Sequence, residues 1–207
     1  MQVRDVRPQV TNWNIANAVT VLRVALVPVL IFALLQQNGQ DTTWRIIAFA
    51  VFALAAISDH IDGHLARSRG LITDFGKLLD PIADKLLIGS ALIVLSVLGE
   101  LPWWITVVIL LREVGITVWR LTIAKTRVIA ASSGGKLKTV LQIFAIGLYI
   151  LPLAGAVQWV LIGREVITFL AIILTVATGI QYLWAARASA QPVTIAASKV
   201  ETNTAGS

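Results

Sequence analysis

Cysteine is absent from the 207-residue sequence, and charged residues are scarce. The absence of cysteine excludes disulfide bonds, thiolate metal sites and a cysteine nucleophile. Charged residues make up 14% of the chain and apolar residues 57%, whereas a soluble domain has about 25% charged and 45–50% apolar residues. The mean hydropathy of +0.82 also indicates a chain more apolar than a soluble domain. The composition therefore predicts a protein whose solvent is a lipid bilayer, and it excludes disorder over most of the chain.

Six apolar segments are long enough to cross a bilayer, because a spanning helix needs about 17–25 residues. They are residues 18–36, 44–61, 79–99, 102–120, 138–160 and 164–186. Residues 1–17 are expected to be a cytoplasmic segment, either an interfacial helix or a flexible lead-in. Residues 188–207, rich in Ala, Ser and Thr, are expected to be a disordered tail. The predicted fold class is an all-α membrane protein whose six-helix domain covers residues 18–187.

Lysine and arginine are distributed unevenly between the expected loops. The loops at 62–78 and 121–137 contain several of them, whereas the loops at 37–43, 100–101 and 161–163 contain none. Because positive residues favour the cytoplasmic side, both termini are expected in the cytoplasm. The net charge of +6 then indicates anionic lipids or phosphorylated substrates. Nucleic acid is not expected as a partner, since no binding motif is present.

Four aspartates lie near the loop between the second and third spans. Asp59 and Asp62 are spaced i,i+3, and Asp80 and Asp84 are spaced i,i+4, so each pair shares one face of a helix. Acids at membrane depth are costly and usually functional, and four carboxylates in one cleft repel one another unless cations neutralise them. This oxygen ligand set predicts one or two divalent ions, Mg²⁺ or Mn²⁺. The structural alternative is pairing of these acids with nearby basic residues at helix ends.

Small residues and an arginine accompany the acids. Gly63 and Ala66 would let a flat or bulky ligand approach the backbone, and Gly76 lies on the same helix face as Asp80. Arg67 has the fork geometry that suits a phosphate. Together with metal-binding carboxylates, these residues predict a site for a diphosphate that opens toward the cytoplasm.

Residues 59–84 read D-x2-D-G-x2-A-R-x8-G-x3-D-x3-D. This pattern resembles the signature of the CDP-alcohol phosphatidyltransferases, integral membrane enzymes with six helices. The resemblance implies that the four aspartates bind two divalent ions and that Asp84 is also the catalytic base. It further implies that a second set lines the CDP-lipid site, namely Gly63, Ala66, Arg67 and Thr73.

The flanking segments are similar to the bacterial branch of this family that makes phosphatidylglycerophosphate. The similarity covers residues 14–23, 73–81 and 135–139. It implies that Asn17 and Thr20 face the CDP group. It also implies a bacterial cytoplasmic membrane location, a homodimer, and transfer of a phosphatidyl group from CDP-diacylglycerol to sn-glycerol 3-phosphate.

Arg112 and Glu113 interrupt the fourth span about ten residues after its start, which is near its middle. One interpretation is a buried ion pair that holds helices together. The functional interpretation is a pocket for the phosphate of the acceptor, formed by Arg112, Arg120, Lys136 and Lys138. Lys136 and Lys138 are equally well explained as positive-inside anchors.

The leading hypothesis is an enzyme in which the acceptor hydroxyl attacks the β-phosphorus of CDP-diacylglycerol, Asp84 takes the proton and CMP leaves. With phosphatidylglycerol as acceptor the same chemistry would make a cardiolipin synthase, and other alcohols would give other lipids. An ion transporter is disfavoured because its acids would be distributed through the membrane depth. A lipid-headgroup scaffold without catalysis is the third alternative, and CMP release distinguishes the enzyme from both.

Overall fold

The computed structural model describes residues 15–68, 73–123, 133–153 and 155–189. These residues form six α-helices and no strand, which confirms the predicted all-α class for this part of the chain. The helices are α1 (Ile15–Leu35), α2 (Thr42–Ser68), α3 (Asp74–Val97), α4 (Trp103–Ile123), α5 (Ser133–Ile150) and α6 (Gln158–Ser189). A short 3-10 helix, η1 (Gln36–Gly39), joins α1 to α2. Most of the predicted N-terminal segment and nearly all of the predicted tail lie outside the described residues.

Several helix boundaries differ from the sequence expectation. α3 begins at Asp74 and not at residue 79, and α6 begins at Gln158 and not at residue 164, so residues 161–163, expected to be a loop, are helical. α2 continues to Ser68, whereas residues 62–68 were expected to belong to a loop; Leu65, Ala66 and Arg67 in this stretch are good helix formers, although Gly63 is not. α5 ends at Ile150, ten residues before the expected end of the fifth span. Pro152 follows two residues later and cannot continue a helix, and Gly155 has a φ of 79°. The pattern of polar and apolar residues alone therefore misplaces the C-terminal ends of α2 and α5.

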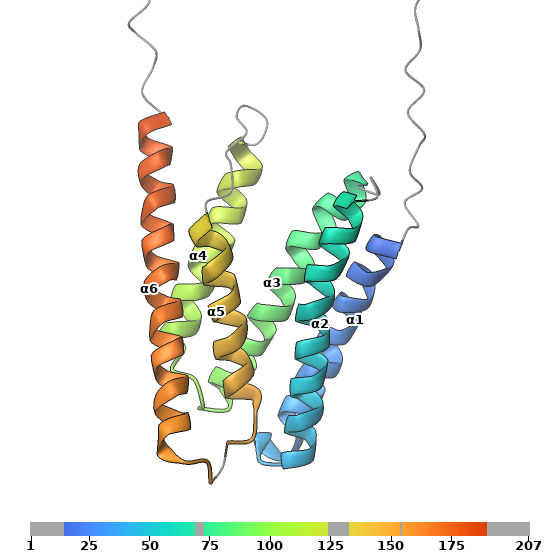
Figure 1. Ribbon diagram of the computed structural model, residues 1–207, viewed down its shortest axis with the longest axis vertical. Coiled ribbons are helices and arrows are strands. Elements are labelled where there is room, and N and C mark those ends of the chain that lie inside the picture. The colour runs from blue at the N-terminus through green and yellow to red at the C-terminus, as the bar shows by residue number, and fades with distance from the viewer. Residues whose placement is uncertain (1–14, 69–72, 124–132, 154, 190–207) are drawn as a thin grey trace, which may run out of the picture.

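The helices alternate in direction along the chain (Figure 1). α1 packs against α2 and α3, α5 packs against α6, and α4 contacts both α3 and α6, while contacts of α5 with α2 and α3 join the two groups. Consequently α1, α3 and α5 begin at the same end of the bundle at which α2, α4 and α6 finish. We call this end the aspartate end and the opposite one, which carries η1, the η1 end.

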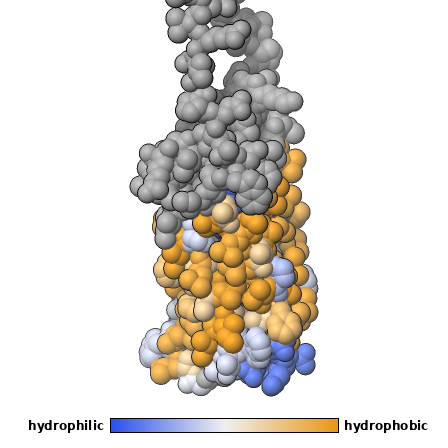
Figure 2. All heavy atoms as spheres, turned by 90° about the vertical axis from the view of Figure 1, so that its right-hand side faces the viewer, coloured by the Kyte–Doolittle hydropathy of each residue, from blue (hydrophilic) through white to orange (hydrophobic). Residues whose placement is uncertain are grey.

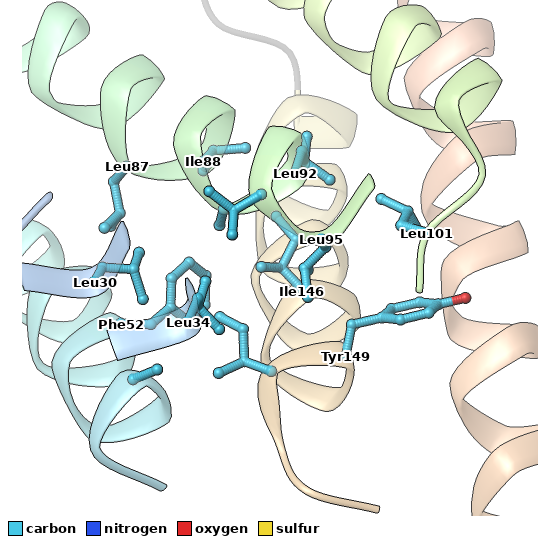
Figure 3. Packing of buried hydrophobic residues seen from close by; sticks show 14 of the residues in the cluster. Leu30, Leu34, Phe52, Leu87, Ile88, Leu92, Leu95, Leu101, Ile146 and Tyr149 are labelled. Carbon is cyan, nitrogen blue, oxygen red and sulfur yellow. The ribbon is translucent and has the colours of Figure 1, made fainter. Parts of the chain in front are cut away.

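The core is built from apolar side chains of α1, α2, α3 and α5 (Figure 3). Leu30, Leu34, Phe52, Leu95 and Ile150 are almost completely buried. Alanines at helix contacts let the backbones approach closely, as is typical of helix packing in membranes; the fully or almost fully buried ones include Ala33, Ala48, Ala55 and Ala91. This close packing fixes α1 against α3, the pair that carries the site.

Large apolar side chains also cover the outside of the bundle. Figure 2 shows a continuous hydrophobic band with hydrophilic atoms below it. The exposed side chains include Leu22, Phe32, Leu111, Phe144 and Phe169. Monomeric soluble proteins rarely expose contiguous apolar patches larger than a few hundred Å², so this surface suits hydrocarbon. Within the described residues, two stretches are long and apolar enough to cross a membrane, Asn17–Gly39 and Gln158–Gln181.

Candidate active site

The start of α3 is fixed by a side-chain cap. Thr73 has an extended backbone, and its Oγ1 accepts a hydrogen bond from the backbone N–H of Gly76 at 3.0 Å. Threonine is a preferred residue at this capping position. Asp80 and Asp84 then follow on α3, and because a helix rises about 1.5 Å per residue, they lie one turn apart on one face. The predicted i,i+4 arrangement of these two acids is therefore present.

Side chains at the start of α1 contact this part of α3. Asn17 donates from Nδ2 to Oγ1 of Thr73 at 2.8 Å, and Thr20 donates from Oγ1 to Oδ1 of Asp80 at 2.7 Å. Asn17 and Thr20 are buried, with exposed fractions of 5% and 2%. Three residues predicted for the CDP-lipid site and one predicted metal ligand thus form two hydrogen-bonded pairs between α1 and α3, which we together call the α1–α3 group: Asn17 with Thr73, and Thr20 with Asp80.

Gly76 makes this contact between α1 and α3 possible. A Cβ atom at this position would lie 2.5 Å from Oδ1 of Asn17 and 3.2 Å from Oγ1 of Thr73. The first distance is too short for any real Cβ contact, so Asn17 would have to move. The sequence interpretation placed Gly76 on the same helix face as Asp80; in the structure the space beside Gly76 holds the side chain of Asn17.

The last turns of α2 carry the other predicted residues of the CDP-lipid and metal sites. These residues are Asp59, Asp62, Gly63, Ala66 and Arg67, all on continuous helix. α2 ends and α3 begins at the aspartate end (Figure 1), so the segments that carry all four acids reach the same end of the bundle. The side chains of the α2 residues lie outside the described part of the structure, and their approach to α3 stays a prediction.

The donor chemistry at the start of α3 suits a hard divalent cation. Asp80 and Asp84 offer carboxylate oxygens, the ligand type that Mg²⁺ and Mn²⁺ prefer. Asp80 has one oxygen engaged by Thr20, and Asp84 has one engaged by Lys85 Nζ at 3.0 Å. Among the side chains that the structure describes, no three His, Cys, Asp or Glu residues gather in one place. A complete metal site therefore needs the acids of α2.

A second polar group surrounds Glu113 in the middle of α4, and we call it the Glu113 cluster. The Glu113 carboxylate is buried and forms ion pairs with Lys85 of α3 and Lys138 of α5. Its neighbour Arg112 donates from Nη1 to Oε1 of Glu113 at 2.9 Å and from Nη2 to Oγ1 of Thr178 at 2.8 Å. The cluster therefore ties α3, α4, α5 and α6 together.

Lys85 joins this cluster to the acids of α3. Its Nζ contacts both Asp84 and Glu113, so two predicted sites that are distant in sequence become neighbours. Three cations, Lys85, Arg112 and Lys138, face the two carboxylates of Asp84 and Glu113. The net charge of these five side chains is therefore +1. A net positive, partly desolvated group of this kind suits a phosphate.

Of the four residues predicted to bind the phosphate of the acceptor, the structure describes the side chains of two. It brings Arg112 and Lys138 together on Glu113; the ion-pair interpretation expected the contact of Arg112 but not that of Lys138. Arg120 and Lys136 lie on α4 and α5, but their side chains lie outside the described part. Lys85 was assigned no site role from the sequence. The signal that could have identified it is its position inside an apolar span directly after Asp84.

Comparison with known proteins agrees with this arrangement. A sequence model of the family described as CDP-alcohol phosphatidyltransferase matches residues 13–181. A protein of Mycobacterium tuberculosis (strain ATCC 25618 / H37Rv) named "Probable phosphatidylglycerophosphate synthase" is 52% identical over 170 residues, which are 82% of this chain and 80% of the relative.

Two further relatives carry the name "CDP-diacylglycerol--glycerol-3-phosphate 3-phosphatidyltransferase". The protein of Bacillus subtilis (strain 168) is 34% identical over 75% of this chain and 91% of its own length. The protein of Escherichia coli (strain K12) is 35% identical over 86% of this chain and 97% of its own length. The matched region begins just before α1 and ends within α6, and it includes both the α1–α3 group and the Glu113 cluster. The chain belongs to the CDP-alcohol phosphatidyltransferase family.

Proposed function

We propose that this enzyme transfers the phosphatidyl group of CDP-diacylglycerol to sn-glycerol 3-phosphate, giving phosphatidylglycerophosphate and CMP. The names of the relatives in M. tuberculosis, B. subtilis and E. coli support this choice of donor and acceptor. One structural observation carries the proposal. Asp84 lies one turn from Asp80 of the α1–α3 group and reaches the Glu113 cluster through Lys85, so a donor site and an acceptor site meet at one carboxylate.

The CDP-lipid is proposed to bind where α1, α2 and α3 meet at the aspartate end. Asn17, Thr20 and Thr73 are held in place by the hydrogen bonds of the α1–α3 group. Their fixed positions lower the ordering cost of binding, as in other preorganised sites. The end of α2 completes this site with the residues predicted from the sequence: Gly63, Ala66 and Arg67.

Enzymes of this family use divalent metal ions, and we propose Mg²⁺ or Mn²⁺ for this one. Asp59, Asp62, Asp80 and Asp84 would hold two ions. When bound, the ions neutralise charge on the diphosphate and on the departing CMP. EDTA is expected to abolish CMP release and added Mg²⁺ or Mn²⁺ to restore it. Full activity in metal-free buffer would contradict this ligand assignment.

Asp84 is proposed to act as the general base. The acceptor hydroxyl oxygen forms a bond to the β-phosphorus of CDP-diacylglycerol, the hydroxyl proton passes to a carboxylate oxygen of Asp84, and the bond from phosphorus to the CMP oxygen breaks. Lys85 donates to Oδ2 of Asp84 at 3.0 Å, which orients the carboxylate. Lys85 is therefore a positioning residue in this proposal.

The Glu113 cluster is proposed to bind the phosphate of the acceptor. Arg112 and Lys138 supply the described cations, and Arg120 and Lys136 would add to them from the same end of α4 and α5. Glu113 keeps Arg112 and Lys138 beside each other, because both donate to its Oε1. Its carboxylate also offsets the cost of burying the charges of Arg112 and Lys138, since an unpaired buried charge is strongly destabilising.

The acceptor is tested by supplying labelled alcohols with CDP-diacylglycerol and identifying the lipid formed. We expect sn-glycerol 3-phosphate to yield phosphatidylglycerophosphate with CMP released in equal amount. A product formed only from phosphatidylglycerol would instead establish a cardiolipin synthase. Failure to release CMP with any acceptor would favour the transporter or the headgroup scaffold.

The enzyme is further proposed to be a homodimer in a bacterial cytoplasmic membrane, with six spans and the aspartate end in the cytoplasm. The supports are the family, the two long apolar helices, and the uneven distribution of Lys and Arg between the two ends.

A further inference from the structure

A polar cavity lies at the η1 end, at the opposite end of the bundle from the proposed active site. Its volume is about 290 Å³. It is lined by residues from three helix connections and the adjoining helix ends, among them Gln40, Thr42, Arg45, Glu100 and Arg164. The hydrophobic band of the surface gives way to hydrophilic atoms at this end (Figure 2), so the cavity lies at the boundary where phospholipid headgroups are found.

Arg45 is a buried cation with unused donors in this cavity. Its side chain is 8% exposed and forms an ion pair with Glu100 through Nη2. Its Nη1 finds no hydrogen-bond partner among the residues that the structure describes. A buried donor without an acceptor is unfavourable, and a guanidinium carries its N–H groups in a fork that matches phosphate oxygens. Arg45 is one of the residues that line the cavity, and a small movement of its side chain toward the cavity would give Nη1 an acceptor there.

A second arginine lines the same cavity. Arg164 lies over the ring of Tyr149, with 4.2 Å from Cζ to the ring centroid, and donates from Nη2 to Oε1 of Glu165 at 2.9 Å. Both contacts hold the guanidinium in place. The segments at the η1 end, residues 36–47, 97–106 and 150–165, contain only two basic residues, Arg45 and Arg164. Both of them face one cavity.

We propose that this cavity binds the phosphodiester of a phospholipid headgroup. Glu100 and Glu165 each balance one arginine, so the cavity lacks the excess positive charge that a phosphate dianion would need, and the less charged diester is the better match. Gln40 and Thr42 offer further polar groups, and the leucines among the lining residues suit the start of the apolar acyl chains of a lipid. The site is separate from both proposed substrate sites, because the α1–α3 group lies at the aspartate end and the Glu113 cluster lies around the middle of α4.

The test is native mass spectrometry of the full-length enzyme, stripped of lipid in neutral detergent and titrated with dioctanoyl-phosphatidylglycerol. Two variants remove the cations: Arg164→Gln, and the double variant Arg45→Gln/Glu100→Gln, which avoids leaving Glu100 unpaired. We expect each to weaken binding of one lipid at least tenfold while CMP release stays within about twofold of the wild type. Arg112→Gln is the matched control, since it removes one arginine charge at the other end and should retain this lipid.

A second arm repeats the titration with inorganic phosphate present. Displacement of the lipid by millimolar phosphate shows that the site binds the phosphate group itself, and no displacement shows that it requires the lipid diester. If the double variant does not fold, lipid binding by Arg164→Gln tests the proposal by itself, because this variant keeps the ion pair between Arg45 and Glu100. Equal lipid binding by the wild type and the folded variants would overturn the proposal.

Discussion

Asp84 is the residue at which the two halves of the proposed site meet. It follows Asp80 by one turn of α3, and its carboxylate contacts Lys85, which in turn contacts Glu113. A base must reach the acceptor hydroxyl while the donor is bound, and the proposed donor and acceptor sites lie on either side of this residue.

Asp84→Asn is expected to reduce turnover by a factor of about 10²–10⁴, the usual contribution of a general base. Binding of CDP-diacylglycerol should largely survive, because the α1–α3 group does not include Asp84. Asp62→Asn should lose binding and turnover together. CMP release and equilibrium binding of CDP-diacylglycerol measure the two effects separately. Near-normal turnover in Asp84→Asn would contradict its role as base.

Gly76→Ala is expected to destabilise the enzyme and weaken its use of CDP-diacylglycerol. The added Cβ would lie 2.5 Å from Oδ1 of Asn17, and overpacking of this kind costs about 1–3 kcal/mol. Thermal unfolding in detergent and the KM for CDP-diacylglycerol measure the two effects. The control is Gly115→Ala on α4, where the new Cβ meets nothing within 4 Å. Equal Tm values for the two variants would show that the contact with Asn17 is unimportant.

At the scale of elements, α3 contributes to every part of the site. Its first turns carry the cap, Asp80, Asp84 and Lys85, and its partners differ on each side: α1 through the α1–α3 group, and α4 and α5 through the Glu113 cluster. The Glu113 cluster also reaches α6 through Arg112 and Thr178. The same charged residues therefore fix helix positions and supply the proposed acceptor site.

Arg112→Gln is expected to impair use of the acceptor far more than use of CDP-diacylglycerol. Loss of a charge-assisted phosphate contact costs about 1.5–3 kcal/mol, which is about 10- to 150-fold in kcat/KM for sn-glycerol 3-phosphate. Steady-state kinetics with each substrate varied in turn measure the difference. Thr178→Val is the control, because it removes the contact of Arg112 with α6, along with hydrogen bonds of Thr178 to its own helix backbone, and leaves the charge of Arg112 in place. A similar loss in both variants would assign Arg112 to helix packing alone.

At the scale of the whole molecule, the described polar and charged side chains gather mainly in three places. The aspartate end contains the α1–α3 group, the Glu113 cluster lies deeper between the helices, and the η1 end contains the cavity of Arg45 and Arg164. Between these places the outer surface is a hydrophobic band (Figure 2). An enzyme with a lipid donor and a water-soluble acceptor needs a site that both substrates can reach, and the aspartate end of a membrane-embedded bundle provides one.

The proposed orientation is tested by cysteine labelling, since the natural chain has no cysteine. Gln40→Cys lies at the η1 end and Ser189→Cys at the end of α6, at the aspartate end. In intact cells a membrane-impermeant maleimide should label Gln40→Cys, and it should label Ser189→Cys only after permeabilisation, because the positive end stays in the cytoplasm. The reverse pattern would contradict the orientation.

The sequence by itself determined the helical class, the approximate place of every helix, and the i,i+4 placement of Asp80 and Asp84. These features follow from local apolar length and helical periodicity, which need no knowledge of distant residues. Local pattern failed at the ends of α2 and α5, where polar residues continue a helix and Pro152 ends one. The close placement of all four acids stays a prediction.

The tertiary structure decided which side chains meet. Thr20 and Asp80 are 60 residues apart in sequence, Lys85 and Glu113 are 28 apart, and Glu113 and Lys138 are 25 apart. Which of several possible partners a buried charge finds depends on how the helices pack and rotate against one another. Helix packing is set by close side-chain contact over the whole bundle, so the sequence offered Arg112 as one possible partner of Glu113, and only the packed helices specified Lys85 and Lys138 as the others.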